Sequence, residues 1–84
     1  MDKTMIPVVI FIGEYIIHGM INHYAGASLD SYLERDRDDF LEIKNARIFL
    51  AATARELYTI GLLEVNKQRV TMIFSEDSII SRGE

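Results

Sequence analysis

The sequence contains no cysteine and no tryptophan, and it has only two histidines among its 84 residues. Without cysteine, the chain cannot form disulfides, thiolate-bound zinc sites or a thiol nucleophile. His18 and His23 fall in one predicted strand at an odd spacing, so they point to opposite faces and cannot share a metal ion. No phosphate-binding glycine loop or nucleophile motif is present either. We therefore expect no catalytic residue, no metal, no cofactor and no enzyme activity.

Long apolar runs are absent too. The longest run, from Met5 to Ile12, is far shorter than the roughly 20 residues that a membrane helix needs. Near the start of the chain Asp2 offsets Lys3, whereas a signal peptide begins with net positive charge. Branched residues dominate the run and favour a strand. We expect a cytoplasmic protein that has no membrane partner.

Apolar residues are plentiful for such a short chain. They make up 49% of it, while 13 acidic residues outnumber 9 basic ones and give a net charge of -4. This hydrophobic content argues against an intrinsically disordered chain. The length suits one small core, so we expect a single domain over residues 1–76 and a polar C-terminal tail over residues 77–84.

Residues 7–12 and 15–24 predict a β-hairpin. Both segments are rich in β-branched and aromatic residues, and Gly13-Glu14 between them is typical of a two-residue type II′ turn. Such a turn sets three cross-strand pairs: Ile12 with Tyr15, Ile10 with Ile17, and Val8 with Gly19.

The two faces of this hairpin are both more apolar than water-facing surfaces usually are. One face should lie in the core and is formed by Val8, Ile10, Ile12, Tyr15, Ile17 and Ile21. The other face is formed by Val9, Phe11, Ile16, His18 and Met20. We expect this second face to be covered by another part of the chain or by a neighbour.

A short helix is predicted after the hairpin. Ser28 is a favourable helix N-cap. Apolar residues at Leu29, Tyr32 and Leu33 have helical spacing, and the charged residues 34–39 suit a solvent-facing side.

Residues 40–51 predict a third strand, followed by a loop near residues 53–56. The alternative over residues 46–58 is a helix with one face formed by Ala46, Leu50, Ala54 and Leu57. The sequence leaves both possibilities open.

Residues 57–65 and 69–75 predict a second hairpin around residues 66–68, since the asparagine there tolerates positive φ. This hairpin would bring Glu64 near Arg69. Five strands in a chain this short leave two edges and an apolar face to cover, and closure of the sheet covers them. We therefore predict a mostly β fold: a small, strongly bent, five-stranded antiparallel barrel with one short helix after the second strand.

Two segments resemble the motifs of the Sm family of small β-barrels. Residues 8–21 form a strand, a tight turn and a second strand with Gly19, similar to the first Sm motif, in which a glycine lets the strand bend. Residues 62–73 are similar to the second motif, two short strands around a tight turn. Residues 29–33 and 40–46 are also similar to small bacterial proteins of Sm and SH3-like type.

The resemblance implies a bent barrel of the kind that assembles into rings of subunits and binds RNA. It covers about residues 7–75. Asn66 and Lys67 stand where the family has an Arg-Gly turn, and they are the only residues that match its RNA-contacting positions. The chain also differs from the family in entering its first strand without a preceding helix, and in the long segment between its second and third strands.

The apolar residues exceed what one small barrel can enclose. Exposed apolar patches usually mark interfaces, so we predict a homo-oligomer, with a ring as one form. The surplus residues expected at its interface are Val9, Phe11, Ile16, Met20, Ile60, Leu62 and Ile73.

RNA binding and protein binding are competing hypotheses for the partner. RNA affinity grows with clustered basic residues, but only Lys67 and Arg69 lie together without an acidic neighbour. Single-stranded RNA is thus implied by the resemblance alone. The alternative is an adaptor or structural subunit that binds another protein and no nucleic acid.

Overall fold

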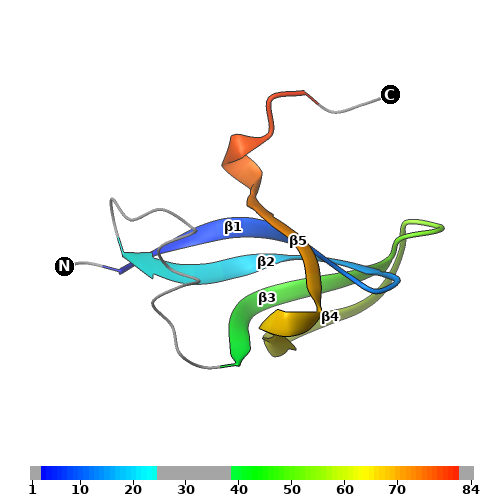
Figure 1. Ribbon diagram of the computed structural model, residues 1–84, viewed down its shortest axis with the longest axis horizontal. Coiled ribbons are helices and arrows are strands. Elements are labelled where there is room, and N and C mark those ends of the chain that lie inside the picture. The colour runs from blue at the N-terminus through cyan, green and yellow to red at the C-terminus, as the bar shows by residue number, and fades with distance from the viewer. Residues whose placement is uncertain (1–2, 25–38, 82–84) are drawn as a thin grey trace.

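The computed structural model describes residues 3–24 and 39–81, which form one antiparallel sheet of five strands (Figure 1). Its strands follow the order β4-β3-β2-β1-β5 across the sheet. The elements in chain order are β1 (Lys3–Ile12), β2 (Tyr15–Tyr24), β3 (Phe40–Leu50), β4 (Arg55–Asn66), the 3-10 turn η1 (Lys67–Arg69), β5 (Val70–Ser75) and the 3-10 turn η2 (Glu76–Ser78).

The first hairpin is confirmed in both its turn and its register. Gly13 has φ of 55° while Glu14 stays at negative φ, as a type II′ turn requires. Ile12 pairs with Tyr15, Ile10 with Ile17, and Val8 with Gly19. Two sequence-adjacent strands joined by so short a turn have little freedom to pair differently, which explains why this part of the fold is readable from the sequence.

The core lies on the predicted inner face of this hairpin. Val8, Ile10 and Ile21 are completely buried, and Ile17 is nearly so. Tyr15 departs from the prediction because it follows the turn at the end of the sheet, where it is 42% exposed. The remaining buried core residues come from β3 and β4: Leu41, Ile43, Ala46 and Val65.

The pairing between β2 and β3 contains a β-bulge. Their register shifts between His18 and Met20, so that Gly19 faces both Asn45 and Ala46. Asn45 has φ of 52°, in the left-handed region that asparagine tolerates better than most residues. A bulge of this kind sharpens the local bend, and β3 curves strongly in Figure 1.

Glycine is required at position 19 because β2 and β3 approach closely at the bulge. A Cβ atom there would overlap the Cγ2 atom of Ile43 and lie 3.3 Å from the carbonyl oxygen of Lys44. On β4, Gly61 lies opposite Asn45, since the residues on either side of the two pair with one another. A Cβ on Gly61 would meet open space. At the bend, therefore, there is no room for a side chain at Gly19 on β2, but there is room for one at Gly61 on β4.

Residues 46–58 form the end of a strand, a turn and the start of another strand, which excludes the helical alternative. Leu50 pairs with Arg55, and the amide of Ala54 donates a hydrogen bond of 2.8 Å to the carbonyl of Leu50. Ala54 has φ of 57° in this turn. The amide of Ala51 also donates to the carbonyl of Glu14 at 2.8 Å, so the two hairpin turns lie side by side.

The predicted second hairpin is wrong. β5 pairs with β1, with Ile73 opposite Ile10 and Met72 opposite Phe11, and it therefore lies at the other edge of the sheet from β4. The turn η1 leads the chain from β4 at one edge of the sheet to β5 at the other edge, so β5 does not fold back beside β4. Pairing with β1 lets Val70 and Ile73 pack on the buried core.

The barrel prediction is corrected as well. In the part of the chain that the structure describes, no pairing joins β4 to β5, so the strongly bent sheet stays open. The predicted helix after the second strand falls in residues 25–38 and lies outside the described residues. Across residues 3–24 and 39–81 no helix has the length and hydrophobicity to cross a bilayer.

Candidate assembly interface

The sheet ends in two different open edges. β4 pairs only with β3 and β5 pairs only with β1 among the described residues. An open edge presents unpaired amide and carbonyl groups that can template another strand. Figure 1 shows β5 running steeply over the sheet near the end of β4, so the chain carries both edges without joining them.

Each edge lies beside an apolar hollow. The larger hollow, of about 620 Å³, lies beside β4; its lining is mainly apolar and includes Ile48, Leu57 and Leu63, with charged residues such as Glu56 at β4 as well. The smaller, of about 310 Å³, lies along β5 and is lined by residues that include Leu41, Val70 and Ile73. A strand added to β4 would therefore place its inward side chains over apolar surface, where they gain burial.

Large apolar side chains are exposed on the two edge strands. On β4, Tyr58 is 65% exposed and Leu62 is 55% exposed, and on β5 Met72 is 51% exposed. Leu62 was predicted from the sequence to lie at an interface, and two more predicted residues, Ile60 and Ile73, lie half-buried on the same two strands.

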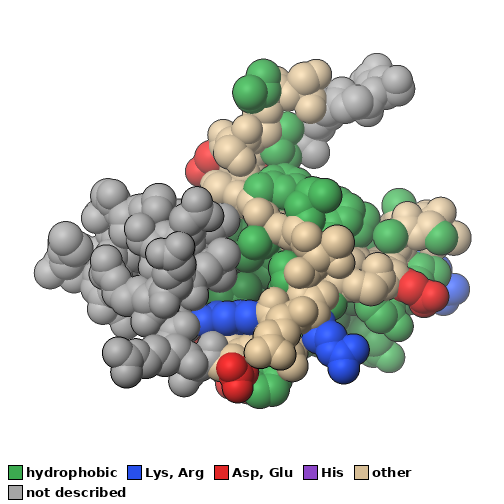
Figure 2. Space-filling model, in the orientation of Figure 1, with side chains coloured by type: hydrophobic (Ala, Val, Ile, Leu, Met, Phe, Trp, Pro, Cys, Tyr) green, Lys and Arg blue, Asp and Glu red, His purple; other side chains and the backbone are tan. Residues whose placement is uncertain are grey.

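The other four predicted interface residues lie on β1 and β2. Val9 is 4% exposed, because its side chain is covered from both neighbouring strands. Phe11, Ile16 and Met20 are half-buried, and the Phe11 ring lies 6.3 Å from the ring of Phe74 on β5. This face is thus partly covered by the chain itself, and Figure 2 shows apolar side chains gathered around β5.

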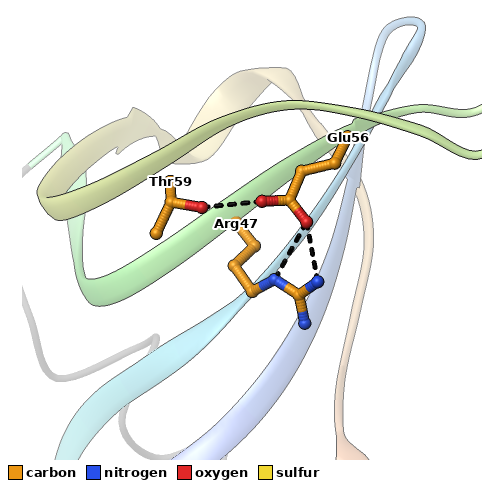
Figure 3. A network of polar contacts seen from close by, with 3 residues as sticks. All are labelled: Arg47, Glu56 and Thr59. Atoms are coloured by element: carbon orange, nitrogen blue, oxygen red, sulfur yellow. Dashed lines mark hydrogen bonds and ion pairs between the residues drawn. The ribbon is translucent and has the colours of Figure 1, made fainter.

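A polar network lies on the outer face of β3 and β4 (Figure 3). Arg47 donates to Oε1 of Glu56 from Nη2 at 2.7 Å and from Nε at 3.3 Å, and Thr59 donates to Oε2 at 2.7 Å. The Thr59 hydroxyl and the Arg47 guanidinium lower the pKa of Glu56. The Arg47 guanidinium also lies 5.1 Å from the ring centroid of Phe49, and the Phe49 and His18 rings are nearly perpendicular with their centroids 5.3 Å apart.

This network is structural, since Arg47 bonds Glu56 across the two strands and Thr59 bonds the same carboxylate from within β4. Thr59 pairs with Arg47 and Glu56 with Phe49 in the β3–β4 ladder, which brings the three polar side chains to one face. The sequence does not reveal this network, because no local signal in it sets the register of β3 against β4.

Asn66 and Lys67, the predicted RNA-contacting residues, lie together where β4 passes into η1. The Asn66 side chain caps the turn by accepting a hydrogen bond of 2.9 Å from the amide of Gln68. The amide of Lys67 donates to the carbonyl of Asp39 at 2.8 Å, which fixes the start of β3 to the turn. Both residues therefore have roles in the turn itself, and RNA binding there stays a prediction.

Comparison with known proteins found no match. No protein-family model matches the chain, and neither the curated proteins nor the solved structures contain a match. The resemblance to the Sm family thus stays a prediction from the residues.

Proposed function

We propose that this protein is a non-enzymatic structural subunit that assembles with copies of itself by adding β5 of one copy to β4 of the next. The observation that carries the proposal is the pair of open edges on different strands. An edge that meets a different edge makes a head-to-tail contact, which repeats to give a closed ring or a filament. The resemblance to the Sm family, whose members form rings, points the same way.

Exposed apolar side chains, which assembly would bury, support this mode of assembly over a purely polar contact. The exposed side chains of Tyr58, Leu62 and Met72 all lie on the two strands that would meet. Main-chain hydrogen bonds supply affinity when a strand is added to a sheet, and side-chain pockets supply specificity. The hollow beside β4 provides such a pocket.

The experiment is light scattering coupled to size-exclusion chromatography at micromolar concentration. We expect a defined oligomer for the unmodified protein and a shift to monomer for Leu62→Lys on β4 and for Met72→Lys on β5. The matched control is Ile80→Lys, because Ile80 is fully exposed but lies beyond η2 and off both edge strands. Circular dichroism confirms that each variant is folded.

A monomer for the unmodified protein across this concentration range would contradict the proposal. Co-purification of a monomer with a different protein in a fixed ratio would also contradict it, and would favour the adaptor alternative. Oligomers that survive both edge substitutions would place the contact elsewhere and overturn the mode of assembly.

A further inference from the structure

The two edge strands run in the same direction. Three antiparallel ladders lead from β1 to β4, so β4 runs opposite to β1, and β5 is also antiparallel to β1. If β5 of one copy joined β4 of the next in parallel, the core-bearing inner faces of both copies would share one side of the joined sheet. An antiparallel contact turns the inner faces to opposite sides, so outward side chains of one edge then lie beside inward side chains of the other.

The exposed apolar side chains at the middle of both edges point outward. On β4, Leu63 pairs with a buried residue of β3 and points inward, so the adjacent Leu62 points outward, where it is 55% exposed. On β5, Ile73 pairs with a buried residue of β1, so the adjacent Met72 points outward and is 51% exposed. A contact between copies can cover both side chains.

Both hollows begin on the inner face. Ile48 and Leu63 line the larger hollow and Ile73 lines the smaller one, and all three side chains pack against the buried core. Each hollow is also lined by an outward neighbour on the same strand, Glu64 in the larger hollow and Met72 in the smaller. Each hollow therefore extends from the inner face to an open edge of the sheet.

Only the antiparallel contact brings the exposed side chains to the hollows. A parallel contact sets Leu62 and Met72 on the same outer side and one hollow beside the other, so neither hollow receives a side chain. We propose that β5 adds antiparallel to β4 of the next copy, that Met72 fills the larger hollow of that copy, and that Leu62 of that copy fills the smaller hollow beside β5. Burial of these apolar side chains favours assembly. The inference rests on the proposed function and names the side chains that hold a second copy of this chain.

One register serves both side chains. It places Met72 opposite Leu63, which lines the larger hollow. The next pair is then Leu62 opposite Ile73, which lines the smaller hollow. A shift by one residue pairs side chains on opposite sides of the joined sheet. A shift by two toward the end of β4 sets the carboxylate of Glu64 against Ile73, and a shift by two the other way meets the bend, where the alternation of β4 is interrupted.

The charges agree with this contact. Lys67 lines the smaller hollow beside β5. Glu64 lies two residues from Leu62 on the same side of β4 and pairs directly with Glu42 of β3. The next copy thus brings two carboxylates, together with Leu62, toward a hollow that a lysine lines. Like charges directly opposite in one copy repel one another, and a cation from a second copy offsets this repulsion.

Cysteine cross-linking tests the register, because the chain has no cysteine of its own. Residues directly opposite in antiparallel strands have Cβ atoms about 4.5–5.5 Å apart, within reach of a disulfide after a small adjustment. We expect Leu63→Cys with Met72→Cys in one chain to give, on mild oxidation, a ladder of covalent multimers that returns to monomer on reduction. Each single variant should stay monomeric on a denaturing gel, because a residue does not meet its own copy across a head-to-tail contact.

The matched control is Leu62→Cys with Met72→Cys. These two side chains point to opposite sides of the joined sheet in the antiparallel contact, so we expect no ladder, whereas a parallel contact sets them on one side. Light scattering before oxidation confirms that each double variant assembles.

The outcomes separate this inference from the proposed function. If the unmodified protein assembles but the Leu62 pair cross-links in place of the Leu63 pair, or if neither pair cross-links, the antiparallel contact is wrong and the proposed function stands. If the unmodified protein stays monomeric, both are wrong. Should Leu63→Cys unfold the chain or prevent assembly, Leu62→Cys with Ile73→Cys, the next pair of the same register, takes its place with the same expected ladder.

Discussion

Gly19 and Ile43 touch so closely across β2 and β3 that no side chain fits on residue 19. Ile43 is completely buried and cannot move aside into solvent, and the carbonyl of Lys44 closes the site from the backbone. Position 19 therefore admits only glycine while β2 and β3 keep this close approach.

Gly19→Ala should lower the free energy of unfolding by about 1–3 kcal/mol, because overpacking a filled core forces side chains and backbone apart. In a domain of this size each kcal/mol corresponds to roughly 4–8 °C in Tm, so thermal unfolding resolves the effect. Gly61→Ala is the matched control, since a Cβ there meets nothing within 4 Å. Equal losses in the two variants would show that the close contact with Ile43 is not the cause.

Ala54→Gly should stabilise the protein. Ala54 has φ of 57°, a left-handed conformation that costs an alanine about 1–2 kcal/mol and a glycine almost nothing. The greater freedom of glycine in the unfolded chain offsets part of this gain, leaving about 0.5–1 kcal/mol. Urea unfolding measures the change in the free energy of unfolding. The control is Ala52→Gly in the same turn, where φ is not positive and we expect a small loss of stability. A loss at both positions would contradict the prediction.

The polar network of Glu56 gives the stability a dependence on pH. The hydroxyl of Thr59, and then the guanidinium of Arg47, hold the pKa of Glu56 below its ordinary value of 4.5. A carboxyl whose pKa is lowered by folding contributes stability that is present above the unfolded pKa and is lost as pH falls through the folded pKa. The contribution should therefore fade on acidification below about pH 4.5.

Thr59→Val tests this assignment because it removes the hydroxyl and keeps the shape of the side chain. We expect the pKa of Glu56, measured by NMR titration of its carboxyl carbon, to move up toward the ordinary value. Thr53→Val is a control in the turn, away from Glu56, and should leave that pKa unchanged. An unchanged pKa in Thr59→Val would assign the shift to Arg47 alone.

Local turn chemistry accounts for what the sequence could predict of this fold. Gly13-Glu14 sets the register of the first hairpin, and that register sorts Val8 and Ile10 into the core. Residues 66–68 also carry a turn signal, but an asparagine cap suits a chain that turns back and a chain that crosses to the far edge equally well. Only tertiary packing on β1 decides between them.

The bulge and the candidate interface also depend on tertiary contacts that local sequence does not predict. Asn45 in the middle of a strand gives no local sign that it will adopt positive φ, because the close approach of Gly19 creates the need for it. Hydrophobicity alone predicts Ile60, Leu62 and Ile73 at an interface, and they lie on the edge strands. Hydrophobicity predicts Val9 at the interface as well, but Val9 is buried between two neighbouring strands, and one of them, β5, comes from the far end of the chain.

The pairing of β1 with β5 also constrains the order in which the protein can fold. β1 to β4 pair with their sequence neighbours, so each of their ladders closes a smaller loop than a pairing between the first and last strands does. The ladder between Val8–Ile12 and Val70–Ser75 instead joins the two ends of the chain, and its loop-closure entropy is the largest in the sheet. During synthesis the growing chain can form its first four strands while the β1 edge still lacks a neighbour, and the arrival of β5 is the step that completes the core.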